Sequence, residues 1–307
     1  MNVPWFSFSL SDFSYAFLSV LLEGIPFILL GTLLSGLIDQ FLPSRLMTRF
    51  LPRNAFLSIC LGGVLGLVFP MCECGIVPVI RRLIGKGLPV SSAIAYMLAA
   101  PIVNPITALS TWAAFRGQGA AEFTALRLGL GFFVAVLAGL AVLNLPIGAV
   151  LKKSVLATVT RLSPTGKTHS QPLGKRLVAA LESGVRDFLD VTVYFIFGVA
   201  VASVFGTAIN QEIFLPLALS EWLAVPSMMA LAALLSLCSS SDAFIAATFV
   251  AFPAVAKLAF LVFGPMVDLK LVFIYSAVFT PRFIAGLAIG LFVVIGLLCI
   301  RLAVVMP

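Results

Sequence analysis

Long apolar runs separated by short polar breaks make up almost the whole chain. Six of these runs are about 20 residues or longer, which is enough to cross a bilayer as a helix. They cover residues 13–38, 88–115, 128–150, 184–206, 258–280 and 283–306. Two more apolar stretches, 54–80 and 222–256, are interrupted by polar segments that contain cysteine or proline. The pattern predicts an all-α, polytopic membrane protein with six full spans and two broken or re-entrant hairpins.

Composition supports this interpretation and excludes several classes of protein. Hydrophobic residues make up 61% of the chain and charged residues only 10%, whereas a soluble domain is about 25% charged. So few charges exclude a soluble enzyme, a nucleic-acid-binding domain and a disordered scaffold. The net charge of +7 is explained by basic residues that gather in cytoplasmic loops. We therefore expect a multi-pass protein of the cell inner (plasma) membrane that contacts lipid and no nucleic acid.

One hydrophilic stretch divides the chain. Residues 151–181 contain six of the 19 basic residues and no acidic residue, which is typical of a cytoplasmic linker. The predicted organisation is an N-terminal transmembrane repeat (1–150), the basic linker (151–181) and a C-terminal transmembrane repeat (182–307).

The two halves show an internal repeat at an offset of 164 residues. Three pairs of equivalent residues coincide without a gap: Cys74 and Cys238, Pro89 and Pro253, and Pro101 and Pro265. Basic residues follow the first span of the first half, whereas the equivalent stretch 207–221 contains acidic residues and no basic one. Equivalent loops on opposite sides of the membrane are typical of inverted repeats. An even number of crossings per half would give parallel repeats, and this alternative stays open.

The first candidate site is the run Cys72, Glu73, Cys74 and Gly75, which places two thiols and a carboxylate within three residues. Gly75 and two flanking prolines cannot sustain a regular helix. A broken helix is tolerated in a membrane where it lines a cavity or is buried in protein. Thiolates bind soft ions such as Cu(I), Zn(II) and trivalent arsenic. The alternative is a kinked, packed helix with incidental cysteines.

The second candidate site occupies the equivalent position in the second half. It runs from Cys238 through Ser239 and Ser240 to Asp242. Pseudo-symmetry would bring both breaks together near the midplane of the bilayer. An intramembrane carboxylate is costly, so Asp242 is a candidate proton carrier or cation ligand. A serine-rich contact between helices is the alternative.

Polar residues that follow prolines form a third candidate pair. Asn104 lies three residues after Pro101, and Asp268 lies three residues after Pro265. Prolines remove helix hydrogen bonds and free carbonyl groups for a ligand. A structural kink alone is the alternative.

Carboxylates in the first span of each half are candidates for proton coupling, and their context predicts burial. Asp187 and Asp190 lie in the second half, where Arg186 could form a simple ion pair with Asp187. Glu23 has no basic residue within 20 positions on either side. It therefore needs a tertiary partner or a proton.

Three motifs together resemble the ArsP/YraQ permease family. They are Met-Cys-Glu-Cys-Gly-Ile-Val-Pro-Val at 71–79, Ala-Pro-Ile-Val-Asn-Pro at 100–105 and Cys-Ser-Ser-Ser-Asp-Ala-Phe at 238–244. Members are multi-pass bacterial inner-membrane permeases, some of which export trivalent organoarsenicals while others are linked to copper or zinc efflux. The resemblance implies recognition of a thiophilic substrate by Cys72, Cys74 and Cys238, with Asn104 and Asp242 beside them.

One position departs from the family pattern. Relatives often carry serine at the position of Glu73. The additional carboxylate favours a cationic ligand over a neutral organoarsenical.

These observations predict a permease and not an enzyme, with a thiophilic substrate exported through a midplane site. The predicted substrate-binding residues are Cys72, Glu73, Cys74, Gly75, Asn104, Cys238, Ser239, Ser240, Asp242 and Asp268. The predicted proton-coupling residues are Glu23, Asp187 and Asp242, and the predicted metal ligands are Cys72, Cys74 and Cys238. We expect no cofactor, and a homo-oligomer or an accessory subunit is a candidate assembly. A membrane thiol redox protein and a passive channel remain the alternatives.

Overall fold

The computed structural model describes residues 9–42, 51–52, 54–153, 155–156, 172–208 and 221–305, and the regular structure in these ranges is nearly all helical. The first half contributes α1 (Leu10–Phe41), α3 (Ala55–Val68), α4 (Ile76–Gly85), α5 (Val90–Ala99), α6 (Pro105–Ala114), α7 (Ala120–Val142) and α8 (Ile147–Val150). The second half contributes α10 (Leu173–Ala208), α12 (Glu221–Leu235), α13 (Asp242–Thr248), α14 (Ala254–Phe263), α15 (Leu269–Tyr275) and α16 (Pro281–Val305). The predicted all-α fold is confirmed.

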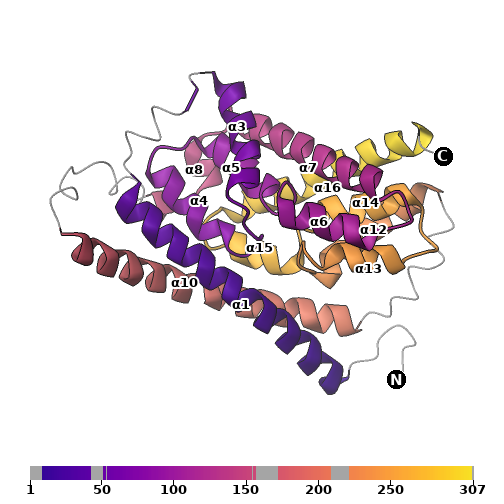
Figure 1. Ribbon diagram of the computed structural model, residues 1–307, viewed down its shortest axis with the longest axis horizontal. Helices are drawn as coiled ribbons and strands as arrows, with labels where there is room; N and C mark the ends of the chain where they lie inside the picture. The colour runs from indigo at the N-terminus through magenta and orange to yellow at the C-terminus, as the bar shows by residue number, and fades with distance from the viewer. Residues whose placement is uncertain are drawn as a thin grey trace.

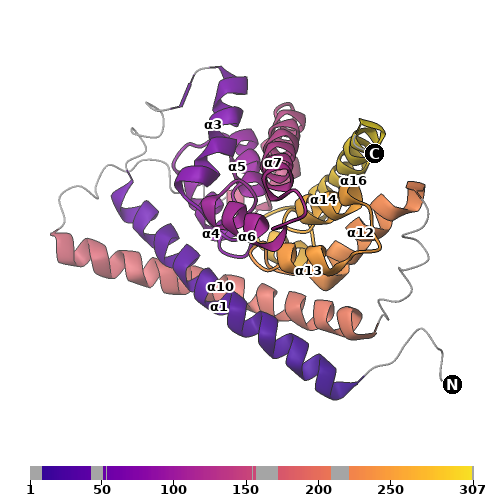
Figure 2. The same ribbon diagram turned by 45° about the vertical axis from the view of Figure 1, so that its right-hand side comes forward.

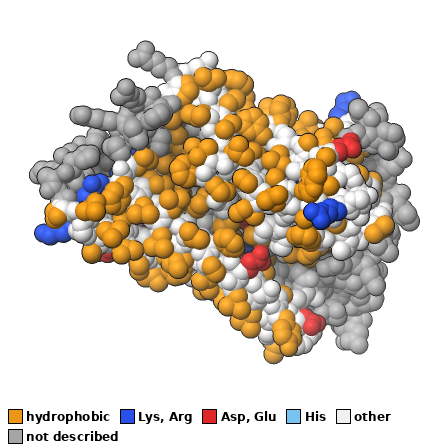
Figure 3. Space-filling view, viewed as in Figure 1, with side chains coloured by type: hydrophobic (Ala, Val, Ile, Leu, Met, Phe, Trp, Pro, Cys, Tyr) orange, Lys and Arg blue, Asp and Glu red, His pale blue; other side chains and the backbone are white. Residues whose placement is uncertain are grey.

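Among the described residues, four helices are long and apolar enough to cross a membrane: α1, α7, α10 and α16. Their large apolar side chains are widely exposed. Figure 3 shows hydrophobic side chains over most of the described part of one face, with few charged ones between them. In a soluble protein such a surface would aggregate, whereas in a bilayer it faces lipid. The structure therefore supports a multi-pass membrane protein.

Two of the six predicted full spans are wrong in one respect, because they are not continuous helices. The run 88–115 is divided into α5 and α6 by a break at 100–104, and the run 258–280 is divided into α14 and α15 by a break at 264–268. A proline stands in each break and cannot donate a backbone hydrogen bond. The stretches 54–80 and 222–256 are broken as predicted, at 69–75 and 236–241.

Among the described helices, both halves have the same order of a long helix, two broken pairs and a second long helix, and the first half then adds the short helix α8. The bounds of α14 lie 164 residues after those of α5. Figure 1 shows α1 and α10, the first long helix of each half, side by side and running in opposite directions. Contacts agree with this, because Gly36 lies against Ala180 and Gly24 lies against Phe195. The inverted repeat stays a prediction, which these observations support.

The broken helices lie mostly between the pair α1/α10 and the pair α7/α16 (Figure 2). Glycines allow the close approach of the backbones. A Cβ at Gly31 of α1 would overlap the carbonyl oxygen of Gly75, and a Cβ at Gly198 of α10 would lie 2.9 Å from the backbone of Lys270. The crossed helices α1 and α10 thus pack directly against the break at 69–75 and the start of α15.

Candidate functional site

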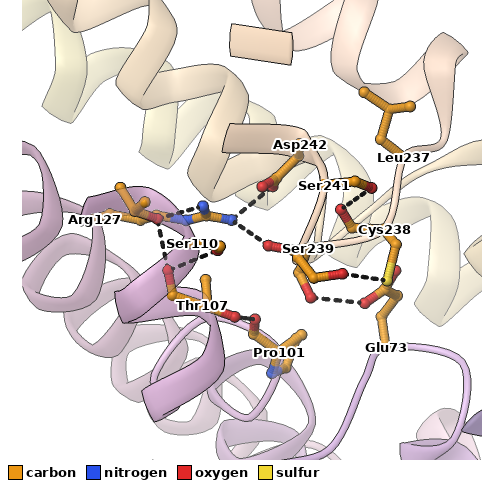
Figure 4. Close-up of polar contacts among 12 residues, drawn as sticks. Glu73, Pro101, Thr107, Ser110, Arg127, Leu237, Cys238, Ser239, Ser241 and Asp242 are labelled. Atoms are coloured by element: carbon orange, nitrogen blue, oxygen red, sulfur yellow. Dashed lines mark hydrogen bonds and ion pairs between the residues drawn. The ribbon is translucent and has the colours of Figure 1, made fainter. Parts of the chain in front are cut away.

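The break at 69–75 and the break at 236–241 meet inside the protein, as the repeat predicts. Ser239 Oγ donates a hydrogen bond of 3.1 Å to Glu73 Oε2, and both side chains are buried. Ser240 Oγ donates to Cys238 Sγ at 3.6 Å. Figure 4 shows Glu73, Cys238 and Ser239 pointing toward one another from opposite halves of the chain. Two candidate sites that are 164 residues apart in the sequence therefore form a single site in the structure.

A small cavity of about 20 Å³ lies at this junction. It is lined by Val20, Glu23, Gly24, Phe27, Cys72, Glu73, Cys74, Phe195, Cys238 and Lys270. Such a volume holds about one water-sized species. The cavity brings together the three thiols predicted as substrate ligands and two of the predicted carboxylates. It also contains a lysine that the sequence did not single out.

Lys270 is the central residue that sequence reasoning missed. Its Nζ donates hydrogen bonds to the carbonyl oxygens of Ser236 (2.7 Å) and Leu237 (3.1 Å). The same Nζ lies 3.3 Å from Glu73 Oε1 and 3.3 Å from Asp268 Oδ2. A lysine inside an apolar segment is itself a signal, because a buried cation requires a partner. The sequence could not show that the partner is Glu73.

The residues predicted beside prolines have a capping role in common. Asp268 Oδ1 accepts a hydrogen bond of 2.7 Å from the backbone N–H of Leu271 at the start of α15. Asn104 Oδ1 accepts one of 2.8 Å from Thr107 at the start of α6, and its amide donates to Ala100. N-caps of this kind satisfy backbone donors of a broken helix. Asp268 also reaches the cavity through Lys270, whereas Asn104 does not line it.

Asp242 lies beside the cavity in a second buried charge cluster. Arg127 Nη2 contacts Asp242 Oδ2 at 2.6 Å and the carbonyl oxygen of Ser239 at 3.3 Å. Arg127 Nη1 donates to Thr111 Oγ1 at 2.8 Å. Figure 4 shows Ser239 between Arg127 and Glu73. The side chain of Arg127 is fully buried, and Asp242 compensates its charge inside the protein.

Asp187, a predicted proton-coupling residue, lies in a third cluster. Its carboxylate accepts hydrogen bonds from Arg82 Nε (3.1 Å), Arg82 Nη2 (3.1 Å) and Ser35 Oγ (2.9 Å). Arg82 also lies 3.6 Å from Asp39. This cluster connects the end of α4 to α1 and α10. It does not contribute to the lining of the cavity.

In the first span of the second half, one alternative and one expectation are wrong. Arg186 pairs with Glu182 at 3.2 Å and not with Asp187, because residues four apart share one helix face. Asp190 is exposed and not buried, since α10 turns that side away from the core. Glu23 is half-buried and lines the cavity, so it is the candidate proton-coupling residue of this region that reaches the thiols.

The cysteines of the cavity are free thiols. Cys74 is buried, whereas Cys72 and Cys238 are partly exposed. In the described part of the chain, no group of three or more His, Cys, Asp or Glu side chains is arranged to hold a metal ion. The assignment of Cys72, Cys74 and Cys238 as metal ligands therefore stays a prediction.

Comparisons with known proteins agree with this picture of a membrane protein. A family model described as "Predicted permease" matches residues 9–303. The chain is 37% identical over 273 residues to UPF0718 protein YcgR of Bacillus subtilis, and the match covers 87% of this chain and 89% of that protein. It is 34% identical over 269 residues to a Streptococcus mutans protein named as a putative two-component membrane permease complex subunit, with 87% of each chain covered. No solved structure matches the chain.

Proposed function

Because this chain belongs to the ArsP family of predicted permeases, we propose that it exports a thiophilic solute through the cavity between its two halves. One observation carries the proposal: Cys72, Cys74 and Cys238 line a single small cavity together with carboxylates. Three thiols at one point in a membrane permease favour a soft ligand, either a trivalent organoarsenical or a soft metal ion.

The chemistry of binding requires a route for protons. A thiol must lose its proton to bind a soft metal ion or arsenic, so each S–H bond that breaks releases one proton. Glu73 and Glu23 line the same cavity as the thiols and can accept these protons. Reprotonation from the outer side would restore the thiols and release the substrate.

Alternating access fits the arrangement of the two halves. Rocking of one half against the other would expose the cavity first to the cytoplasm and then to the outside. The sequence holds no nucleotide-binding motif, so we assign the energy to an ion gradient or to a partner. One relative is named as a subunit of a two-component complex, and we extend a partner subunit to this chain on that basis.

Flux into everted membrane vesicles tests the proposal. The probes are methylarsenite, Cu(I) and Zn(II), each offered with and without a proton gradient. We expect saturable accumulation of one probe, loss of that accumulation in the double variant Cys74→Ser/Cys238→Ser, and no loss in Cys60→Ser. Cys60 is the matched control because it does not line the cavity.

Other outcomes would contradict the proposal in different ways. Accumulation that the double variant retains would remove the thiols from the mechanism. Flux without saturation would indicate a passive channel. A disulfide between cavity cysteines that cycles with a membrane reductant would indicate a redox protein, although a Cys-x-Cys pair closes a strained ring. Accumulation of none of the three probes would show that thiophilic export is wrong for this chain.

A further inference from the structure

The buried charges around the cavity do not sum to zero. Glu73 and Asp268 contribute two carboxylates, and Lys270 contributes one ammonium group that lies 3.3 Å from each of them. The neighbouring Arg127 and Asp242 compensate each other. One excess negative charge therefore remains on the Glu73–Asp268–Lys270 cluster. A buried, uncompensated charge is costly, so this cluster favours the entry of a cation.

Backbone carbonyls hold Lys270 at this position. Two of its three N–H groups are used by the carbonyl oxygens of Ser236 and Leu237 in the break at 236–241. Ser236 has a φ of 48°, which residues other than glycine rarely adopt. The backbone therefore turns sharply at Ser236, one of the two residues whose carbonyl oxygens bind the ammonium group of Lys270. The lysine is anchored by the second half, and its charge faces a carboxylate of the first.

Each of the two carboxylates has one oxygen atom that faces Lys270 without forming a hydrogen bond. Glu73 Oε1 and Asp268 Oδ2 are buried and make no hydrogen bond. Each lies within ion-pair distance of Lys270 but outside hydrogen-bonding geometry. A single ammonium group with one N–H left cannot satisfy both atoms. One carboxylate oxygen is therefore available to a second cation.

We propose that Lys270 is a specificity-determining residue, a tethered cation that fixes the net charge of this cluster at −1 and restricts the occupant to one monovalent cation. This rests on the proposed function and narrows its substrate class to a soft monocation. Without Lys270 the two carboxylates would carry a charge of −2 and suit a divalent ion. A cavity of about 20 Å³ agrees with an occupant of one atom.

Glu23 is half-buried at the edge of the cavity and is not among the described contacts of Lys270, so it is counted outside the Glu73–Asp268–Lys270 cluster.

Thiol labelling tests the charge without any knowledge of the substrate. Cys238 is partly exposed and reports on the cavity that it shares with Glu73 and Lys270. The purified protein is treated with a cationic reagent (trimethylammonium-ethyl methanethiosulfonate) or an anionic one (sulfonatoethyl methanethiosulfonate). The rate of modification at Cys238 is read by mass spectrometry, and the ratio of the two rates is normalised to that of a free thiol.

Variants of the two charged residues should move this ratio in opposite directions. We expect it to favour the cationic reagent in the wild type, to rise about tenfold in Lys270→Gln and to fall about tenfold in Glu73→Gln, since a unit charge at short range has an effect of this order. The double variant Lys270→Gln/Glu73→Gln restores the charge of −1 and should return the ratio to its starting value. Lys270→Arg should retain it.

A matched control separates charge from structure. Lys257 of α14 is also buried but does not line the cavity, so Lys257→Gln should leave the ratio unchanged. Every variant is first checked for monodisperse elution. If Lys270→Gln does not fold, Glu73→Gln still tests the proposal through its opposite sign.

Two results would overturn the proposal. An unchanged ratio in both single variants would show that these charges do not act on the thiols. A shift in the same direction in both would show that the substitutions merely open the structure. Because labelling requires no transport, a charge-dependent ratio without flux of any probe would contradict the proposed function and would still support a charge of −1 at this cluster.

Discussion

At the scale of single residues, Arg127 and Asp242 determine how the two halves are joined beside the cavity. The guanidinium and the carboxylate are buried and lie 2.6 Å apart. The pair is not a large source of stability, because both charges lose their hydration. Its importance is that neither residue can be removed alone. Asp242, predicted as a proton carrier, could take up a proton only by giving up this ion pair.

We expect Asp242→Ala to destabilise the protein by about 3–5 kcal/mol, because it leaves the guanidinium of Arg127 buried and uncompensated. The double variant Arg127→Met/Asp242→Leu should recover most of this loss, since it removes both charges. Unfolding in denaturing detergent measures the difference. Equal losses in the single and the double variant would contradict the ion-pair explanation.

Arg127 and Lys270 also show what the sequence could not reveal. The thiols and carboxylates could be predicted from local motifs, since Cys72–Gly75 and Cys238–Asp242 each lie within a few residues. A buried basic residue has no such local motif. The partner of Arg127 is Asp242, which lies 115 residues further along the chain. Only the tertiary fold brings the two residues together.

At the scale of elements, prolines and glycines shape the site more than hydropathy does. The run 258–280 is apolar enough to be predicted as one span, yet it is divided into α14 and α15. Hydropathy averages over a window and cannot detect a break whose flanking residues are apolar. The signal that existed was the proline followed by a capping residue, Asp268. The breaks at 69–75 and 236–241 were predicted because they contain polar residues.

Gly31 of α1 should be sensitive to substitution by alanine. A Cβ there would overlap the carbonyl oxygen of Gly75, so α1 or the break at 69–75 must shift. We expect Gly31→Ala to lower the melting temperature of the protein by several degrees and to alter the labelling rate of Cys72. On α7, Gly129 has no heavy atom near an added Cβ, so Gly129→Ala should be neutral or stabilising by up to about 1 kcal/mol. Equal effects of both variants would exclude close packing as the cause.

At the scale of the whole molecule, three ion pairs connect the first half to the second within the described residues. They are Glu73–Lys270, Arg82–Asp187 and Arg127–Asp242. The proposed rocking of the halves would either keep these ion pairs formed or break them. The Arg82–Asp187 pair lies away from the cavity and ties α4, which follows the break at 69–75, to α1 and α10. We interpret this ion pair as a contact that keeps α4 packed against α1 and α10.

We expect Asp187→Asn to loosen α4 and to raise the rate of N-ethylmaleimide labelling at Cys72 about tenfold. Arg186→Gln is the matched control, because Arg186 forms an exposed pair with Glu182, and such pairs contribute about 0–1 kcal/mol. An unchanged labelling rate in Asp187→Asn would show that this cluster does not restrain the break. Loss of proton-dependent flux with unchanged labelling would instead favour the predicted proton-coupling role of Asp187.

The division of each ion pair between the halves also has a consequence for how the protein is made. Glu73, Arg82 and Arg127 leave the ribosome before Lys270, Asp187 and Asp242 are synthesised. During that interval Glu73 and Arg127 lie in apolar surroundings without the partners that they have in the folded protein, whereas Arg82 already has Asp39 of α1. The insertion machinery must therefore keep the first half in a hydrated or shielded environment until the second half arrives. A chain truncated after the linker would retain these unmatched charges permanently and become a substrate for membrane proteases.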